Sequence, residues 1–118
     1  MPKLVHSRDG KFQQEWNLQP GNLLIGRHPD SDIRLDDTTV SGRHAMITVR
    51  PSAYMEGLLD VFIEDLNSTN GTLVNGKQIN RHMFKHGEVA VIGGHEFAFI
   101  DEATRGFETT TVILPDAE

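Results

Sequence analysis

The chain has 118 residues, a formal net charge of −6 at pH 7 and no cysteine. That length suits one domain with a sizeable core, and the lack of cysteine excludes disulfides and thiolate chemistry. No apolar run approaches the about 18 residues of a membrane span, and residues 1–6 lack the apolar core of a secretory signal. The sequence therefore predicts a soluble, single-domain, cytoplasmic protein.

The negative charge is concentrated at the C-terminal end of the chain. Residues 101–118 contain five acids and one base, so they carry −4 of the total −6 and leave −2 for the first 100 residues. An acidic total argues against nonspecific nucleic-acid binding through a broad basic surface. It still permits a small basic anion site elsewhere on the chain.

Short and alternating apolar runs dominate the chain, and no segment sustains a helical periodicity over three turns. Turn pairs such as Asp9-Gly10 and Gly93-Gly94 separate these runs. Asn75-Gly76 is the strongest hairpin prediction, because a type I′ turn needs two residues that tolerate positive φ. Strands at this spacing indicate an all-β sandwich or barrel. The expected strands are Lys3–His6, Phe12–Asn17, Leu23–Gly26, Ile33–Leu35, His44–Arg50, Leu58–Asp65, Thr72–Val74, Lys77–Ile79, Val89–Ile92 and Glu96–Ile100.

The strand pattern also sets the expected domain limits. We expect the β-sandwich to occupy residues 1–100, with a longer surface loop at 51–57. The alternation fades in residues 101–118, which we expect to form a flexible acidic tail. Alternating strand positions predict core aromatic side chains, with Phe84 closing an edge of the sandwich. These core positions are Trp16, Phe62, Phe97 and Phe99.

Three loop motifs follow one another between the expected strands: Gly26-Arg27, Ser41-Gly42-Arg43-His44 and Ser68-Thr69-Asn70-Gly71-Thr72. A phosphothreonine presents about −1.5 to −2 charges and three acceptor oxygens. The Arg27 guanidinium matches two of these oxygens with a planar fork, and the Ser41 hydroxyl can donate to the third. The Asn70 amide offers one acceptor and two donors to a peptide backbone. The motifs therefore predict a phosphothreonine-peptide site.

The same motifs resemble the forkhead-associated (FHA) domain. The third one is preceded by Asp65-Leu66 and followed by Val74-Asn75-Gly76, and the segment Gly87–Gly93 resembles the family's last strand pair. The resemblance covers about Leu23 to Ile100. It implies an eleven-stranded β-sandwich that binds phosphothreonine peptides with loops at one end.

The resemblance also implies roles for individual residues. Arg27 and Ser41 align with the family's phosphate ligands, and Asn70 aligns with the asparagine that bonds the peptide main chain. Thr69 and Arg43 are further candidates for peptide contacts.

Other matching positions are architectural: Gly26 permits a tight turn, His44 ties the loops together, and Gly71 belongs to the same structural motif. Gly42 departs from a common version of the family, which has asparagine there, and this affects peptide selectivity. Thr39 lies where the family often contacts the third residue after the phosphothreonine, and it carries no charge, so we expect an apolar or undemanding preference for that peptide residue.

Other functions are less favoured by the pattern. Ser41 and His44 have no clear third partner and no Gly-x-Ser-x-Gly motif, so we expect no enzymatic activity. His82 and His86 have i, i+4 spacing but no acidic partner at ligand spacing, which favours solvent-facing histidines over a metal site. No cofactor is expected. The alternative to a phosphopeptide reader is a phosphate-independent scaffold, such as a component of a secretion system or the cell envelope.

The segment Glu108–Leu114 contains candidate phosphosites, each followed by an aliphatic residue three positions later: Thr109, Thr110 and Thr111. Small bacterial FHA proteins that are kinase substrates resemble this layout; the alternatives are a disordered acidic terminus and a last strand. A tether from Ile100 to Thr110 spans at most about 33–36 Å and averages about 18 Å. We therefore expect tail-mediated self-association in trans. The expected partners are phosphothreonine proteins and a Ser/Thr kinase, without nucleic acid or membrane insertion.

Overall fold

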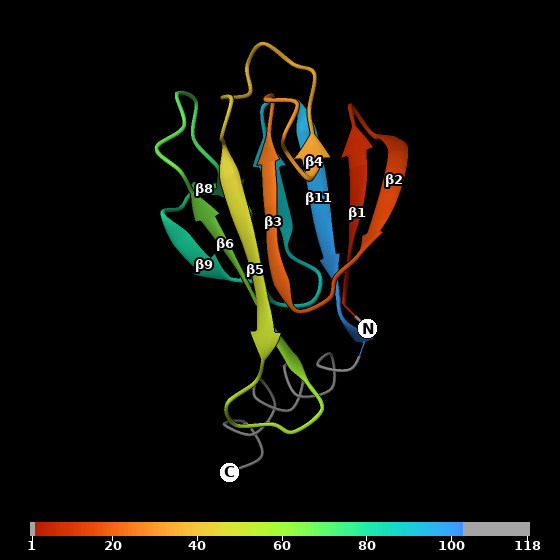
Figure 1. Ribbon diagram of the computed structural model, residues 1–118. Helices are drawn as coiled ribbons and strands as arrows, with labels where there is room; N and C mark the ends of the chain where they lie inside the picture. Colours follow the sequence, from red (N-terminus) through yellow and green to blue (C-terminus); the bar gives the residue numbers. More distant parts are fainter. Residues whose placement is uncertain (1, 103–118) are drawn as a thin grey trace.

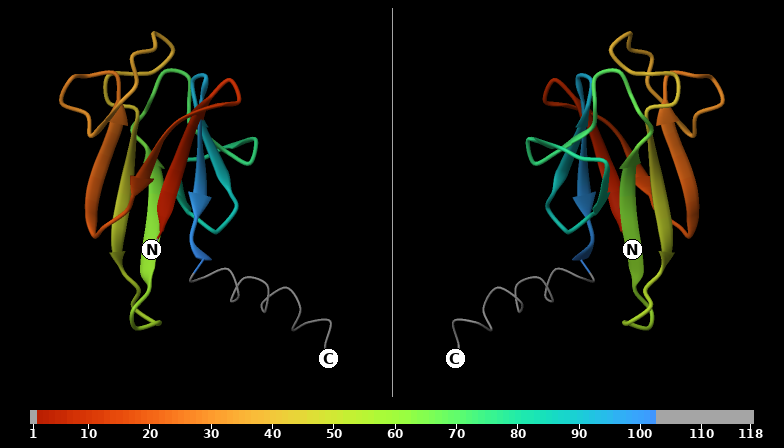
Figure 2. Two further views of the ribbon diagram at one scale, coloured as in Figure 1. Left: turned by 90° about the vertical axis from the view of Figure 1, so that its right-hand side faces the viewer. Right: turned by 90° about the vertical axis from the view of Figure 1, so that its left-hand side faces the viewer.

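The computed structural model describes residues 2–102, which form an all-β sandwich of two sheets packed face to face (Figure 1, Figure 2). One sheet has six strands in the order β2-β1-β11-β10-β7-β8, and the other has five in the order β4-β3-β5-β6-β9. The strands are β1 (Lys3–Arg8), β2 (Lys11–Asn17), β3 (Gly21–Gly26), β4 (Ile33–Arg34), β5 (Ala45–Pro51), β6 (Leu59–Asp65), β7 (Leu73–Val74), β8 (Lys77–Gln78), β9 (Arg81–Met83), β10 (Val89–Ile92) and β11 (His95–Ile100).

The core lies between the two sheets because alternate strand residues point inward. In β5, Ala45, Ile47 and Val49 are buried, while the residues between them are more exposed. β11 contributes Phe97 and Phe99 from the opposite sheet, as its alternation predicts. Phe84 is also buried and stacks on Phe99 with ring centroids 5.0 Å apart.

The predicted strands are confirmed to within two residues at each end, and one strand was missed. β9 has a basic residue and a half-buried histidine, so no apolar alternation marks it; its pairing with β6 places Met83 opposite Phe62. The predicted hairpin at Asn75-Gly76 is confirmed, since φ is 51° at Asn75 and 82° at Gly76.

The prediction for Phe62 was wrong, because the pleat of β6 turns its neighbours Val61 and Ile63 inward instead. Phe62 lies on the outer face of the five-stranded sheet. The guanidinium carbons of Arg50 and Arg81 lie 4.6 and 4.2 Å from its ring centroid. Cation–π contacts of this kind cover the ring with charged side chains in place of core residues.

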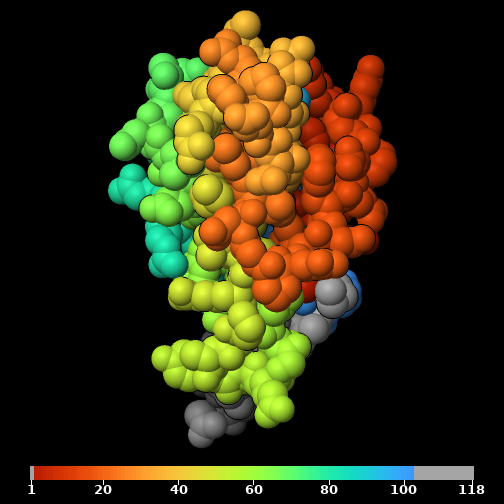
Figure 3. All heavy atoms as spheres, in the orientation of Figure 1, coloured from red at the N-terminus to blue at the C-terminus, as the bar shows by residue number. Residues whose placement is uncertain are grey.

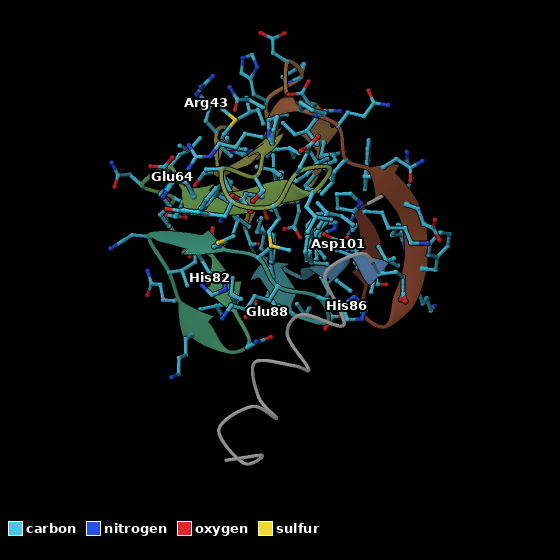
Figure 4. All side chains as sticks on the ribbon, turned by 90° about the horizontal axis from the view of Figure 1, so that it is seen from below. Arg43, Glu64, His82, His86, Glu88 and Asp101 are labelled. Atoms are coloured by element: carbon cyan, nitrogen blue, oxygen red, sulfur yellow. The ribbon has the colours of Figure 1, made fainter. Side chains whose placement is uncertain are left out.

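The predicted solvent-facing histidines are also corrected. His82 is half-buried, and its Nε2 lies 2.9 Å from Oε1 of Glu88, which the sequence did not identify as a partner. His86 accepts a hydrogen bond at Nδ1 from the Asp101 backbone N–H, 3.0 Å away. Figure 4 shows both pairs from the end of the molecule where β11 finishes.

β1 begins and β11 ends at one end of the sandwich, while the loops that follow β3 and β6 lie at the other (Figure 1). The candidate phosphosites Thr109, Thr110 and Thr111, with most of the predicted tail, lie outside the described residues. Within residues 2–102, no helix is long and apolar enough to cross a membrane.

Candidate functional site

The three loop motifs meet at one end of the sandwich. They occupy the connections between β3 and β4, between β4 and β5, and between β6 and β7. Figure 1 places these connections together at the top of the molecule, and Figure 3 shows the atoms of residues 27–43 covering that end. Motifs that are far apart in the sequence therefore form one surface.

The first two loops are joined through their main chains. The Arg27 N–H donates to the Ser41 carbonyl oxygen at 3.0 Å, and the His28 N–H donates to the Gly42 carbonyl oxygen at 3.1 Å. A Cβ on Gly26 would overlap the Gly42 carbonyl group. Glycine at position 26 is therefore required by close approach of the two backbones, since its φ is not in the left-handed region.

His44 joins the second loop to the third and is fully buried. Its Nδ1 accepts from the Ser41 N–H at 3.0 Å, and its Nε2 lies 2.8 Å from the Gly71 carbonyl oxygen. Because a carbonyl oxygen only accepts and an N–H only donates, the ring is the neutral tautomer with its proton on Nε2. A single side chain thus fixes the spacing between Ser41 and Gly71.

The third loop is built on the Asp65 carboxylate at the end of β6. Oδ2 accepts from the Ser68 N–H at 3.1 Å, Oδ1 accepts from the Thr72 hydroxyl at 2.8 Å, and the Ser68 hydroxyl also bonds to Oδ1. Burial alone would raise the pKa of Asp65, but the hydrogen bonds from Ser68 and Thr72 outweigh it and lower this pKa. Gly71, at φ 86°, closes the turn by donating its N–H to Ser68 Oγ.

Ser41 and Asn70 are both engaged in hydrogen bonds that leave them able to bind a ligand. Ser41 Oγ accepts from the Thr69 N–H at 2.9 Å, so its own hydroxyl proton is not used in that bond. Asn70 donates one Nδ2 hydrogen to the Thr39 carbonyl oxygen at 2.8 Å. Its Oδ1 and second Nδ2 hydrogen remain outside that bond.

The cationic side chains at this end are exposed. Arg27 projects from the first loop and Arg43 from the second, and both are solvent-accessible. Arg34 also belongs to this end, since its Nε donates to the Arg27 carbonyl oxygen at 3.1 Å. Sequence reasoning missed Arg34, because it lies in a two-residue strand with no motif around it. The arrangement can present positive charge together with hydroxyl and amide groups to an anionic ligand.

Comparison with characterised proteins finds relatives with regulatory names. The chain is 40% identical over 98 residues to the oxoglutarate dehydrogenase inhibitor of Corynebacterium jeikeium, which covers 83% of this chain and 63% of that protein. It is 37% identical over 97 residues to the glycogen accumulation regulator GarA of Mycolicibacterium smegmatis, covering 82% of this chain and 57% of that protein. The chain thus spans about three fifths of the length of these relatives.

The fold and the motifs also match a known family. A solved structure from a study of phosphothreonine-dependent FHA domain interactions superposes with a TM-score of 0.71 and 33% identity, covering 86% of this chain and 96% of that one. The family model of the FHA domain matches residues 23–93, more than half of the chain and all three loop motifs. The resemblance found in the sequence is therefore confirmed, and the chain belongs to the FHA-domain family.

Proposed function

We propose that this chain is a phosphothreonine-peptide-binding adaptor of cytoplasmic Ser/Thr-kinase signalling, with no enzymatic activity of its own. Arg27 and Ser41 hold the phosphate, and Asn70 holds the peptide main chain. The observation that carries the proposal is the locking of three loops at one end of the sandwich by main-chain bonds and by buried His44. That locking fixes the spacing of the three side chains before a ligand binds, which lowers the entropic cost of binding.

Each proposed ligand group suits the phosphate. The exposed Arg27 guanidinium donates two parallel hydrogen bonds to phosphate oxygens, and it stays charged at any physiological pH. Ser41 Oγ already accepts from Thr69 N–H, so its proton is free to donate to a third oxygen. Arg43 and Thr69 flank this position on their loops. Phosphothreonine is preferred over phosphoserine because its γ-methyl adds about 0.8 kcal/mol of apolar burial.

The relatives support a partner that is itself a protein. Their names describe one inhibitor of a dehydrogenase and one regulator of glycogen accumulation, and the solved neighbour comes from work on phosphothreonine-dependent interactions. We therefore expect this chain to bind a threonine-phosphorylated protein downstream of a Ser/Thr kinase, and to regulate that protein by binding to it.

The proposal includes phosphorylation of the C-terminal segment at Thr109, Thr110 or Thr111, followed by pairing between copies. β11 ends at the end of the sandwich away from the loops (Figure 1), and a seven-residue strand such as β5 already spans about 23 Å. A phosphorylated tail therefore reaches a neighbour's loops more easily than its own. Light scattering after kinase treatment should give a dimer or larger mass, and a persistent monomer mass at high concentration would refute the pairing.

The direct test of the reader function is an anisotropy titration with degenerate phosphothreonine, phosphoserine and unphosphorylated peptide pools. We expect saturable binding of the phosphothreonine pool alone. Arg27→Ala removes the guanidinium that neutralises the phosphate. The binding free energy should weaken by about 2–5 kcal/mol, so the affinity should fall roughly 30-fold to several thousandfold. Arg50→Ala is the matched control, because it removes an exposed arginine that lies over Phe62 on the sheet face.

The same titration separates the reader from its main rival. Equal or absent binding of all three pools, or an unphosphorylated partner that still binds after Arg27→Ala, would favour a phosphate-independent scaffold. If Arg27→Ala binds the phosphothreonine pool as tightly as the wild type does, the chain is still a phosphothreonine reader, but Arg27 is not one of its phosphate ligands.

A further inference from the structure

Two buried histidines lie next to the proposed binding end and play no part in the site described above. His6 in β1 and His95 in β11 are 7% and 5% exposed. His6 Nε2 and His95 Nδ1 are 2.8 Å apart, and the His6 ring stacks on Phe97. The two rings therefore form a buried polar pair at the edge of the apolar core.

Asp37, in the connection between β4 and β5, is the carboxylate beside this pair. His95 Nε2 lies 3.5 Å from Asp37 Oδ2, and Arg8 lies 3.8 Å from the same oxygen. Among the described residues, His95 Nε2 makes no hydrogen bond, so Asp37 lies beside the ring without being bonded to it. The contact between His6 Nε2 and His95 Nδ1 needs one donor and one acceptor, and either ring can supply the proton.

Asp37 in turn fixes the main chain of the loop that carries Ser41. Its Oδ1 accepts from both the N–H and the hydroxyl of Thr39, at 2.8 and 2.7 Å. The Thr39 carbonyl oxygen then accepts from Asn70 Nδ2 at 2.8 Å. A continuous polar chain thus runs from the six-stranded sheet, through Asp37 and Thr39, to the amide of Asn70.

The turn between β10 and β11 packs closely against the same loop. A Cβ on Gly93 would lie 2.5 Å from Thr39 Oγ1 and 3.1 Å from a methyl of Val40. Gly93 also adopts φ 60°, which favours glycine. Thr39 is therefore confined between the Asp37 carboxylate and the glycine turn, although its own side chain is on the surface.

We propose that Asp37 is a positioning residue that orients Asn70 toward the peptide main chain through Thr39. The inference rests on the proposed function of the site and adds the element that sets its peptide affinity. Asn70 is exposed, so without the bond to Thr39 its side chain would sample several rotamers. Ordering one such side chain before binding changes affinity by roughly 2- to 12-fold.

A double-mutant cycle tests this inference on the full chain. Asp37→Ala, Asn70→Ala and the double variant are titrated with the tightest phosphothreonine peptide and with free O-phosphothreonine. We expect Asp37→Ala to weaken peptide binding about 2- to 12-fold, and to cause no further loss once Asn70 is alanine. Free O-phosphothreonine, held by Arg27 and Ser41, should bind equally well to the wild type and to Asp37→Ala. Asp36→Ala is the control, since it removes a neighbouring exposed carboxylate.

The outcomes separate this inference from the function on which it rests. If Asp37→Ala weakens peptide binding equally in the wild type and in Asn70→Ala, or does not weaken it at all, the positioning role is overturned and the reader function stands. If the wild-type chain binds no phosphopeptide, the Asn70 side-chain amide resonance still reports on positioning, and an unshifted resonance in Asp37→Ala would refute it. If Asp37→Ala does not fold, Asp37→Asn replaces it; this variant keeps an acceptor for Thr39 and should lose less affinity.

Discussion

The buried histidine pair predicts how stability depends on pH. Burial, with a smaller contribution from the neighbouring His95, lowers the pKa of His6 from 6.5 to about 4. The folded state therefore favours the neutral ring. Between about pH 4 and pH 6.5 the unfolded chain binds more protons than the folded chain, so the free energy of unfolding rises with pH across this window. Stability from this group is present above pH 6.5 and is lost as the pH falls towards 4.

The size of the effect follows from the shift. A difference of about 2.5 pKa units corresponds to about 3.4 kcal/mol at full protonation, of which about 2 kcal/mol is lost between pH 7 and pH 5. His95 adds to the loss in the same direction, because burial and then Arg8 lower its pKa, and these outweigh Asp37 and Asp9, which raise it. With a urea m value of about 1–3 kcal/mol/M, the unfolding midpoint should fall by on the order of 1 M.

Urea unfolding at pH 7 and pH 5 measures this loss, and an NMR titration of the His6 ring measures its pKa directly. His6→Phe keeps the stacking on Phe97 but removes the titrating group, so it should show a smaller loss between the two pH values. His28→Ala, at an exposed position, should behave as the wild type does. A midpoint that does not change between pH 7 and pH 5, or a His6 ring that titrates near 6.5, would refute the reasoning.

Two further substitutions test how the loops are held. Gly26→Ala places a methyl group against the Gly42 carbonyl and should cost about 1–3 kcal/mol of stability, as overpacking does. The control is Gly42→Ala, whose methyl group meets no atom within 4 Å and should change the stability little. Equal thermal midpoints for the two variants would contradict the close approach of the two backbones. His44→Ala leaves the Ser41 N–H and the Gly71 carbonyl unpaired, so urea unfolding should show a loss of about 3–5 kcal/mol. A loss below 1 kcal/mol would mean that water replaces the ring.

The sequence predicted the strands well because burial on one face imposes a period of two. Val61 and Ile63 show why this pattern has limits: they alternate with Phe62, and apolar residues at three consecutive positions leave the inward face undecided. β9 was missed for the opposite reason, since it has no apolar face and is held by its pairing with β6. Local patterns therefore identify strands that have one buried face, whereas a strand without such a face is found only through its partner strand.

The candidate site was predictable in part because its residues occupy loop motifs of fixed composition. The residues that hold those loops in place were harder to find. The bonds of His44 to Gly71, Thr69 to Ser41 and Asn70 to Thr39 join positions 27, 28 and 31 residues apart. No local pattern encodes such separations. Resemblance to a family identified His44, whereas Asp37 lay outside every motif.

This difference has a consequence for how binding can be lost. The side chains proposed to touch the peptide, such as Arg27 and Asn70, are exposed and cost little stability when changed. Their supports, His44 and Asp37, are largely buried, and each makes more than one hydrogen bond. On the proposed roles, we expect a substitution among the supports to shift a ligand group without contacting the ligand, so that affinity falls although the loop motifs are intact. Asp37 also lies beside Arg8 and His95, so the loop that carries Ser41 contacts the six-stranded sheet as well as its own.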